Sequence, residues 1–213
     1  SSEKTQNHEV LMRYILYKIT GKSYGVTEYS IEDFFSNGGL DGTTIGSYFG
    51  DWNGGTHEEF IQAVAPYAVV DMQQHQIYAS VTIAQAIIES GWGQDEIALK
   101  YKNFFGMKGK QGSSGNEFWS GEVVVLNASE GGKATFRVYD SLKNSIYDHG
   151  RNFHVTATYK AHGVLECIAN NLGPREQAKR IQESGYAQNS SYADLLYSII
   201  QSNDLEKYDS MTV

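Results

Sequence analysis

The sequence has little of several features that would assign it to other classes of protein. It contains one cysteine in 213 residues, Cys167, so an internal disulfide is excluded and this side chain is expected to be small and buried. No run is long and apolar enough to cross a membrane, and no signal peptide is recognisable. With 17 Lys and Arg against 25 Asp and Glu, the net charge is −8 and no basic stripe exists to neutralise phosphates. We therefore expect neither nucleic acid nor a membrane as a partner.

Nothing in the sequence indicates a metal or a cofactor. The six histidines are scattered, and the two nearest pairs, His149 with His154 and His57 with His75, lack the spacing of zinc ligands. The glycine-rich segment 106–112 lacks the Gly-Lys-Ser/Thr ending and the preceding strand of a phosphate loop. We expect no metal site and no cofactor.

Composition divides the chain near residue 55. Residues 8–20 and 27–36 carry helical patterns, whereas residues 37–55 are glycine-rich with little periodicity. A loop this long is uncommon inside a compact domain, so it is either a boundary or a loop packed along the main body. We expect residues 1–55 to be an N-terminal helical extension with a Gly-rich connection, and residues 56–213 to be the main domain.

Helical patterns dominate the main domain. A capping box from Thr56 to Glu59 opens a helix, which Pro66 either kinks or replaces with a new one. A further helix begins near Ser80, and residues 141–202 are again helical in pattern.

Between these helical regions, residues 117–138 are β-branched and alternate, with a break at 130–133, which predicts a hairpin. The expected fold class is α+β, mainly helical, with a small β-hairpin lobe.

One carboxylate, Glu89, lies in the most continuously apolar stretch of the chain. Apolar residues of 80–93 point in every direction around a helix, so this helix should be buried on nearly all sides. Burial without a nearby Lys or Arg disfavours the anion and raises the pKa, as a group that donates a proton near neutral pH requires. Gly91 and Gly93 should end the helix sharply and leave Glu89 at a rim, beside Trp92. The alternative is a Glu on the one polar edge of a core helix.

The segment around Glu89 resembles the glucosaminidase family of peptidoglycan hydrolases, glycoside hydrolase family 73, with an autolysin-type catalytic domain. The family pattern S-x-x-I-A-Q-A-x-x-E-S-x-W-G, then N-x-F-G-x-K-G, is matched from Ser80 to Gly93 and from Asn103 to Gly109. Downstream, residues 119–141 resemble the family's hairpin, and 184–193 resemble its S-G-Y-A-T-D-P-x-Y-A segment. The resemblance covers roughly residues 57–202. It implies a lysozyme-like fold and makes residues 56–213 a glucosaminidase catalytic domain.

The resemblance also implies which residues act. Glycoside hydrolysis needs a proton for the leaving oxygen and usually a second carboxylate. Glu89 is the expected general acid. The second carboxylate should project from the hairpin, where Glu130 falls at the family's T-x-E-Y glutamate and Glu122 is the fallback. Around Glu130 the sequence departs from the family, with Ala128-Ser129 before it and Gly131 after it, so a solvated turn glutamate is the alternative.

Six further residues are candidates for substrate binding. Tyr186 and Tyr192 match family positions that line the saccharide site, with helix packing as the alternative. Asn103 is expected to cap or orient a turn near the cleft. Trp92 and Trp119 are either core residues or stacking platforms. The full set is Trp92, Asn103, Phe104, Trp119, Tyr186 and Tyr192.

The expected activity is that of an endo-β-N-acetylglucosaminidase, which cleaves the β-1,4 bond between N-acetylglucosamine and N-acetylmuramic acid in peptidoglycan glycan strands. Two alternatives remain: a lytic transglycosylase of lysozyme-like fold, and an inactive cell-wall-binding module. A start at Ser-Ser without Met is typical of a catalytic fragment of a longer exported protein. We therefore expect a secreted, cell-wall-associated monomer.

Overall fold

The computed structural model describes residues 51–110, 115–127 and 131–211. The helices expected at 8–20 and 27–36, most of the Gly-rich connection, and Glu130 lie outside the described residues. In chain order the elements are α4 (His57–His75), α5 (Ala79–Ser90), α6 (Glu96–Tyr101), β1 (Trp119–Asn127), β2 (Gly132–Tyr139), α7 (Leu142–Val155), α8 (Ala157–Ala161), η2 (Val164–Glu166), α9 (Gly173–Glu183), α10 (Tyr192–Ser202) and η3 (Leu205–Tyr208).

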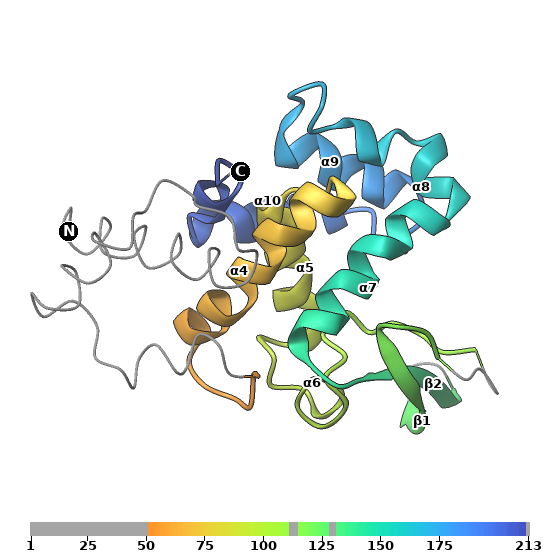
Figure 1. The fold of residues 1–213 in the computed structure, drawn as a ribbon. Helices are drawn as coiled ribbons and strands as arrows, with labels where there is room; N and C mark the ends of the chain where they lie inside the picture. The colour runs from red at the N-terminus through yellow and green to blue at the C-terminus, as the bar shows by residue number, and fades with distance from the viewer. Residues whose placement is uncertain (1–50, 111–114, 128–130, 212–213) are drawn as a thin grey trace, which may run out of the picture.

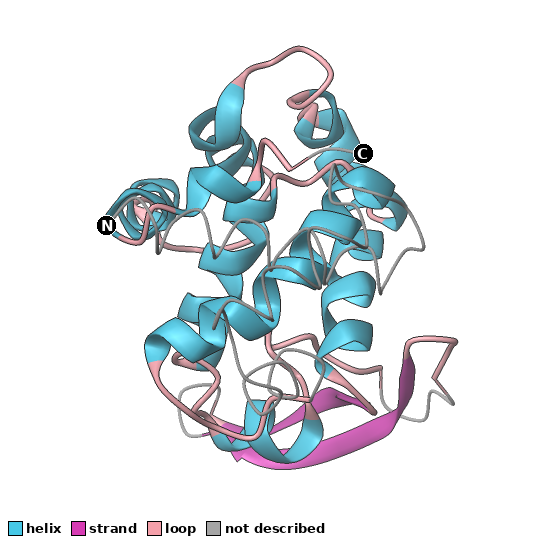
Figure 2. Cartoon of the chain, turned by 60° about the vertical axis from the view of Figure 1, so that its left-hand side comes forward, coloured by secondary structure: helices cyan, strands magenta, loops and turns pink. Residues whose placement is uncertain are grey.

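The core is built around α5, which packs against both α4 and α10, while α7 packs on α4 and α9 on α10 (Figure 1). Every residue of α5 from Ala79 to Ile87 is buried, so the helix is enclosed on nearly all sides as its sequence predicts. The strands lie together at one end of the molecule, with helices making up the rest (Figure 2). The mainly helical α+β class with a small hairpin lobe is confirmed.

The first described helix begins as its sequence predicts. Thr56 Oγ1 accepts a hydrogen bond from the Glu59 amide at 3.2 Å, and the Glu59 carboxylate accepts one from the Thr56 amide at 2.7 Å. Pro66 lies inside the single helix α4, so of the two alternatives at this residue the start of a new helix is excluded. The helix tolerates the missing proline N–H because its packing on α5 and α7 stabilises it.

The packed body includes residues before the expected boundary at 55/56. Trp52 is 5% exposed, and its Nε1 donates to the Gly93 carbonyl at 2.9 Å. Its ring meets Phe60 edge-on, with centroids 5.1 Å apart. A Cβ at Gly93 would collide with both aromatic rings, so only glycine allows this close approach. Trp52 thus supports the loop that follows Glu89.

The hairpin is antiparallel, with an irregularity between Trp119 and Gly121. The segment after α6 joins the hairpin to the helical body, because Lys108 forms a β-bridge with Phe136 and the Arg137 amide donates to the Met107 carbonyl at 3.0 Å. The segment that follows the Glu89 loop and α6 therefore lies alongside β2.

Candidate active site

The end of α5 has the sharp turn that its glycines predict. Gly91 is the left-handed C-cap, at φ 54°, and its amide donates to the Ile87 carbonyl. Trp92 and Gly93 also have positive φ, at 60° and 70°. Ser90 secures this turn, since its Oγ accepts from the Gly93 amide at 2.8 Å. Three successive left-handed residues leave Glu89 half-buried on the last turn of a buried helix.

Glu89 is held by a tyrosine from a distant part of the chain. The Tyr192 hydroxyl, at the first residue of α10, donates to Glu89 Oε1 at 3.0 Å. The same hydroxyl oxygen accepts from Gln85 Nε2 at 3.2 Å, and Gln85 lies one helical turn before Glu89. Sequence reasoning named Tyr192 as a substrate contact and did not assign a role to Gln85. The spacing of four residues between Gln85 and Glu89, which places both on one face of the helix, is the signal in the sequence that indicates this role for Gln85.

The surroundings of Glu89 and Tyr192 raise the pKa of both groups. Burial raises the pKa of Glu89, and the hydrogen bond from Tyr192 lowers it in part. Burial, and then the negative charge of Glu89, raise the pKa of Tyr192 well above that of an ordinary tyrosine. Tyr192 therefore stays protonated at neutral pH and acts as the donor. In the described part of the chain Glu89 has no ion-pair partner, so the raised pKa that its sequence predicts is supported by its surroundings.

An aromatic cluster packs against Tyr192. The half-buried Tyr186 ring stacks on Tyr192 with centroids 5.6 Å apart, and on Phe153 at 6.1 Å. His149 meets Tyr186 edge-on and stacks on Phe105 at 3.8 Å. Burial lowers the pKa of His149 to about 3, so this ring is neutral and adds no charge beneath the site. Both predicted tyrosines are thus packed together, next to Glu89.

The two tryptophans differ in position. Trp92 is half-buried and stacks on His57, with centroids 3.8 Å apart and an interplanar angle of 2°. Trp119 is 6% exposed at the base of the hairpin, with the Arg137 guanidinium 5.1 Å over its ring. Trp119 was expected to be either a core residue or a stacking platform, and its burial supports the core residue. His57 is a neighbour of Trp92 that sequence reasoning missed.

Asn103 and Phe104 are internal. The Asn103 amide donates to the carbonyls of Met107 and Arg137, both at 2.9 Å, and its Oδ1 accepts from the Met107 amide. Asn103 therefore orients the turn after α6 and ties it to β2, as expected of a turn-orienting residue. Phe104 is 0% exposed and packs near Phe60, so substrate cannot reach its side chain in this structure.

The hairpin carboxylates are less completely described. Glu122 lies on β1, and its Oε1 is buried without a hydrogen-bond partner in the described residues. That oxygen lies against Gly109, where a Cβ would collide with it. Glu130 lies outside the described residues. The structure therefore leaves the identity of the second carboxylate as a prediction.

A buried ionic anchor fixes the hairpin to the helical body. Asp148 on α7 is 0% exposed and accepts from Arg137 Nη1 at 2.6 Å and from the Tyr139 hydroxyl at 2.7 Å, both from β2. No local pattern singles out Asp148, because α7 carries polar and charged residues along its whole length. Within residues 51–110, 115–127 and 131–211, no group of three His, Cys, Asp or Glu side chains could hold a metal ion.

Comparison with known proteins is consistent with this geometry. The glucosaminidase family model, described as mannosyl-glycoprotein endo-beta-N-acetylglucosaminidase, matches residues 65–205. The exo-glucosaminidase LytG of Bacillus subtilis (strain 168) is 34% identical over 162 residues, which are 71% of this chain and 53% of the relative. A probable N-acetylmuramidase of Lactococcus lactis subsp. cremoris (strain MG1363) is 30% identical over 158 residues, 71% of this chain and 35% of that protein. The chain thus spans about half or less of these relatives.

A solved structure shares the fold. The glycoside hydrolase domain from Salmonella typhimurium FlgJ is 25% identical with a TM-score of 0.55, over 72% of this chain and 91% of that domain. The lysozyme-like fold that the resemblance implies is confirmed by this likeness and by the helical body with its two-stranded sheet. The family model alone matches well over half of the sequence. This chain belongs to the glucosaminidase family.

Proposed function

We propose that this chain is the catalytic part of a peptidoglycan hydrolase, an endo-β-N-acetylglucosaminidase that cleaves the β-1,4 bond between N-acetylglucosamine and N-acetylmuramic acid. The observation that carries the proposal is the half-buried Glu89 with a raised pKa, held by Tyr192 at the end of a rigid core helix. Family membership supports the reaction class, and the printed name of the Bacillus subtilis relative supports the glucosaminidase specificity.

In this mechanism Glu89 gives its proton to the leaving oxygen, which is O4 of the muramic acid. The anion that forms is stabilised by the hydrogen bond from Tyr192, which is already in place before the reaction. Gln85 positions the Tyr192 hydroxyl from the same helix. Of the proposed substrate contacts, Trp92 and Tyr186 are half-buried, so part of each side chain is accessible.

Glu130 is the proposed second carboxylate, and activation of water is its proposed role. Making Glu130→Gln and Glu122→Gln separately tests the assignment. A large loss of activity in the first alone supports Glu130, and a loss in the second alone moves the base to Glu122. If both variants stay active while Glu89→Gln is inactive, a one-carboxylate reaction assisted by the acetamido group of the substrate becomes the better account.

Product analysis tests the proposed bond. Muropeptides digested with the chain are reduced with borohydride and examined by mass spectrometry, and we expect glucosaminitol ends. Muramitol ends would assign the activity named for the Lactococcus lactis relative, and anhydro ends would identify a lytic transglycosylase. If no new reducing ends form, the chain is a wall-binding module instead. The length distribution of early products separates internal cutting from terminal cutting, which the name of the Bacillus subtilis relative specifies.

The proposal includes the place of action. Peptidoglycan lies outside the cytoplasmic membrane, so the chain should act after export, at the cell wall and as a monomer. None of the described helices is long and apolar enough to span a membrane. Fractionation of cells that make the full-length protein tests the location, and sedimentation of the purified chain tests the monomer.

A further inference from the structure

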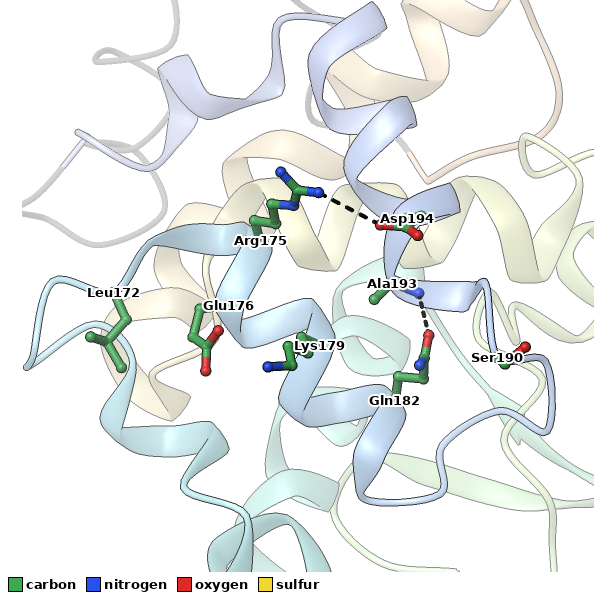
Figure 3. A pocket seen from close by; sticks show the side chains of 8 residues that line it. All are labelled: Leu172, Arg175, Glu176, Lys179, Gln182, Ser190, Ala193 and Asp194. Atoms are coloured by element: carbon green, nitrogen blue, oxygen red, sulfur yellow. Dashed lines mark hydrogen bonds and ion pairs between the residues drawn. The ribbon is translucent and has the colours of Figure 1, made fainter.

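A second feature of the fold lies on the outer side of α9 and α10. A cavity of ≈ 490 Å³ runs along the groove between these helices (Figure 3). Figure 3 shows Leu172 and Ser190 at its two ends, with the charged side chains between them. Its lining is Leu172, Arg175, Glu176, Lys179, Gln182, Ser190, Ala193 and Asp194.

The lining carries two charges of each sign. One of them, Glu176, is already paired, because its Oε1 accepts from Arg180 Nε, outside the cavity, at 3.0 Å. Arg175 Nη2 lies 3.8 Å from Asp194 Oδ1, with the side chains 71% and 79% exposed. Lys179 Nζ reaches Glu183, outside the cavity, at 3.8 Å, and its side chain is 59% exposed. Exposed pairs at such distances contribute little and exchange readily with solvent or with a ligand. The cavity therefore offers two cations, Arg175 and Lys179, and one anion, Asp194, that a charged ligand can engage.

One end of the cavity lies at the start of α10, the helix that also carries Tyr192. Ala193 lines the cavity, and its amide donates to Gln182 Oε1 at 2.8 Å, a bond that joins α10 to the end of α9. The preceding residue is Tyr192, whose hydroxyl holds Glu89. The start of α10 thus contributes Tyr192 to the candidate active site and the next residue, Ala193, to the groove.

We propose that this groove binds the peptide stem of the muramic acid whose O4 receives the proton from Glu89. The inference rests on the proposed function. The stem is attached through O3, the neighbour of O4, so it leaves the glycan beside the acid. Four or five extended residues reach about 15 Å. Arg175 and Lys179 meet stem carboxylates, Asp194 meets the amine of a diamino acid, and Leu172, 40% exposed, offers apolar contact.

Charge of both signs distinguishes this ligand from an anionic wall polymer. A polyanion would gain from Arg175 and Lys179 but would be repelled by Asp194, which lies on the same groove. A stem peptide, with carboxylates and an amine at different positions, satisfies both sets. The groove thus fits a zwitterionic peptide better than a uniformly charged chain.

The test compares two soluble substrates: glycan strands that carry peptide stems, and the same strands after an amidase has removed them. Arg175→Glu is the variant, because an acidic residue in the first turn of α9 suits the helix dipole and should leave folding intact. Lys207→Glu, with the same change in net charge at the opposite end of α10, is the matched control. We expect Arg175→Glu to lower kcat/KM about tenfold on stem-bearing strands, and less than about twofold on bare strands.

The outcomes separate the two proposals. If wild-type chain releases glucosaminitol ends from both substrates and Arg175→Glu lowers both rates equally, lowers neither, or behaves like Lys207→Glu, the stem site is refuted while the glucosaminidase proposal stands. If wild-type chain releases none from either substrate, the glucosaminidase proposal itself fails. Acetylation of the stem amine provides a second test. It should lower the rate of cleavage by wild-type chain, and on the acetylated substrate Asp194→Asn should lower the rate no further. An undiminished effect of Asp194→Asn would contradict the assignment of the anions.

Discussion

Two regions supply the carboxylates of the proposed site, and they are stabilised in different ways. Glu89 ends α5, a helix enclosed by α4 and α10, and its carboxyl is already bonded to Tyr192. The hairpin is a two-stranded sheet, and its outer residues Val124 and Leu126 are 54% and 84% exposed. Such a pair of strands has little independent stability. The hairpin therefore depends on its anchor at Asp148, whereas the acid depends on the core itself.

The difference assigns separate tasks to the two regions. A proton donor needs a fixed position and a fixed pKa, which the core provides. A carboxylate on a lightly packed hairpin can approach when sugar binds, as lids and loops commonly do. Substitutions at each region should therefore differ in kind: those near Glu89 change the chemistry, and those at the hairpin base change stability and positioning.

The largest effect is expected from the acid. Glu89→Gln keeps the shape of the side chain and removes the proton, so turnover of cell walls should fall by at least about 10²-fold, the usual lower range for loss of general acid catalysis. Folding should persist, because the amide replaces a carboxyl whose ionised form burial disfavours. Glu96→Gln, on the short helix α6 and highly exposed, is the control with near-native activity. A folded Glu89→Gln variant with native activity would refute the proposed mechanism.

The next effect is expected at the hairpin anchor. Asp148→Ala leaves Arg137 and Tyr139 without their shared acceptor, so the free energy of unfolding should fall by about 3 kcal/mol, as when one partner of a buried pair is removed. Urea unfolding measures the loss. Asp194→Ala, which removes an exposed carboxylate of a loose pair, should cost less than about 1 kcal/mol. Equal losses in the two variants would mean that the anchor does not hold the hairpin.

A smaller effect is expected from the residue that holds the acid. Tyr192→Phe removes one hydrogen bond to Glu89, worth about 1 kcal/mol, so kcat should fall about fivefold. Because that bond lowers the pKa of Glu89, its loss should raise this pKa further. The alkaline limb of kcat/KM should then move to higher pH. An unchanged limb together with unchanged kcat would show that Tyr192 only packs.

The smallest effect is expected at the outer face of the hairpin. Leu126→Ser alters a side chain that is 84% exposed, so the free energy of unfolding should change by less than about 0.5 kcal/mol. Thermal unfolding checks this, and kcat/KM on glycan strands should stay within about twofold of wild type. A large rise in KM with unchanged stability would instead place Leu126 in contact with the sugar, and would sharpen the role of the hairpin.

The sequence predicted what local pattern determines. Features that depend on neighbouring residues are predictable from the sequence. They are the buried α5, its glycine end, the capping box at Thr56 and the hairpin. The bond from Tyr192 to Glu89 joins residues 103 positions apart, so only the family resemblance pointed to it. The contact of Trp52 with Gly93 also joins distant residues, and the Asp148 anchor depends on burial. No periodicity in the sequence predicts either of them. Phe104 shows the opposite error, since proximity to the motif does not make a core residue accessible.

The most direct measurement is the titration of Glu89 itself, by ¹³C NMR of the side-chain carboxyl with Glu89→Gln to assign its signal. Since burial raises the pKa, the carboxyl should titrate clearly above the ordinary value of 4.5, and remain protonated over a range in which exposed glutamates are ionised. Activity should be present below that pKa and be lost as the pH rises through it, with the alkaline limb of kcat/KM following the same midpoint. A Glu89 that titrates at or below 4.5, in an active chain whose rate is flat through neutral pH, would contradict the account of a buried general acid.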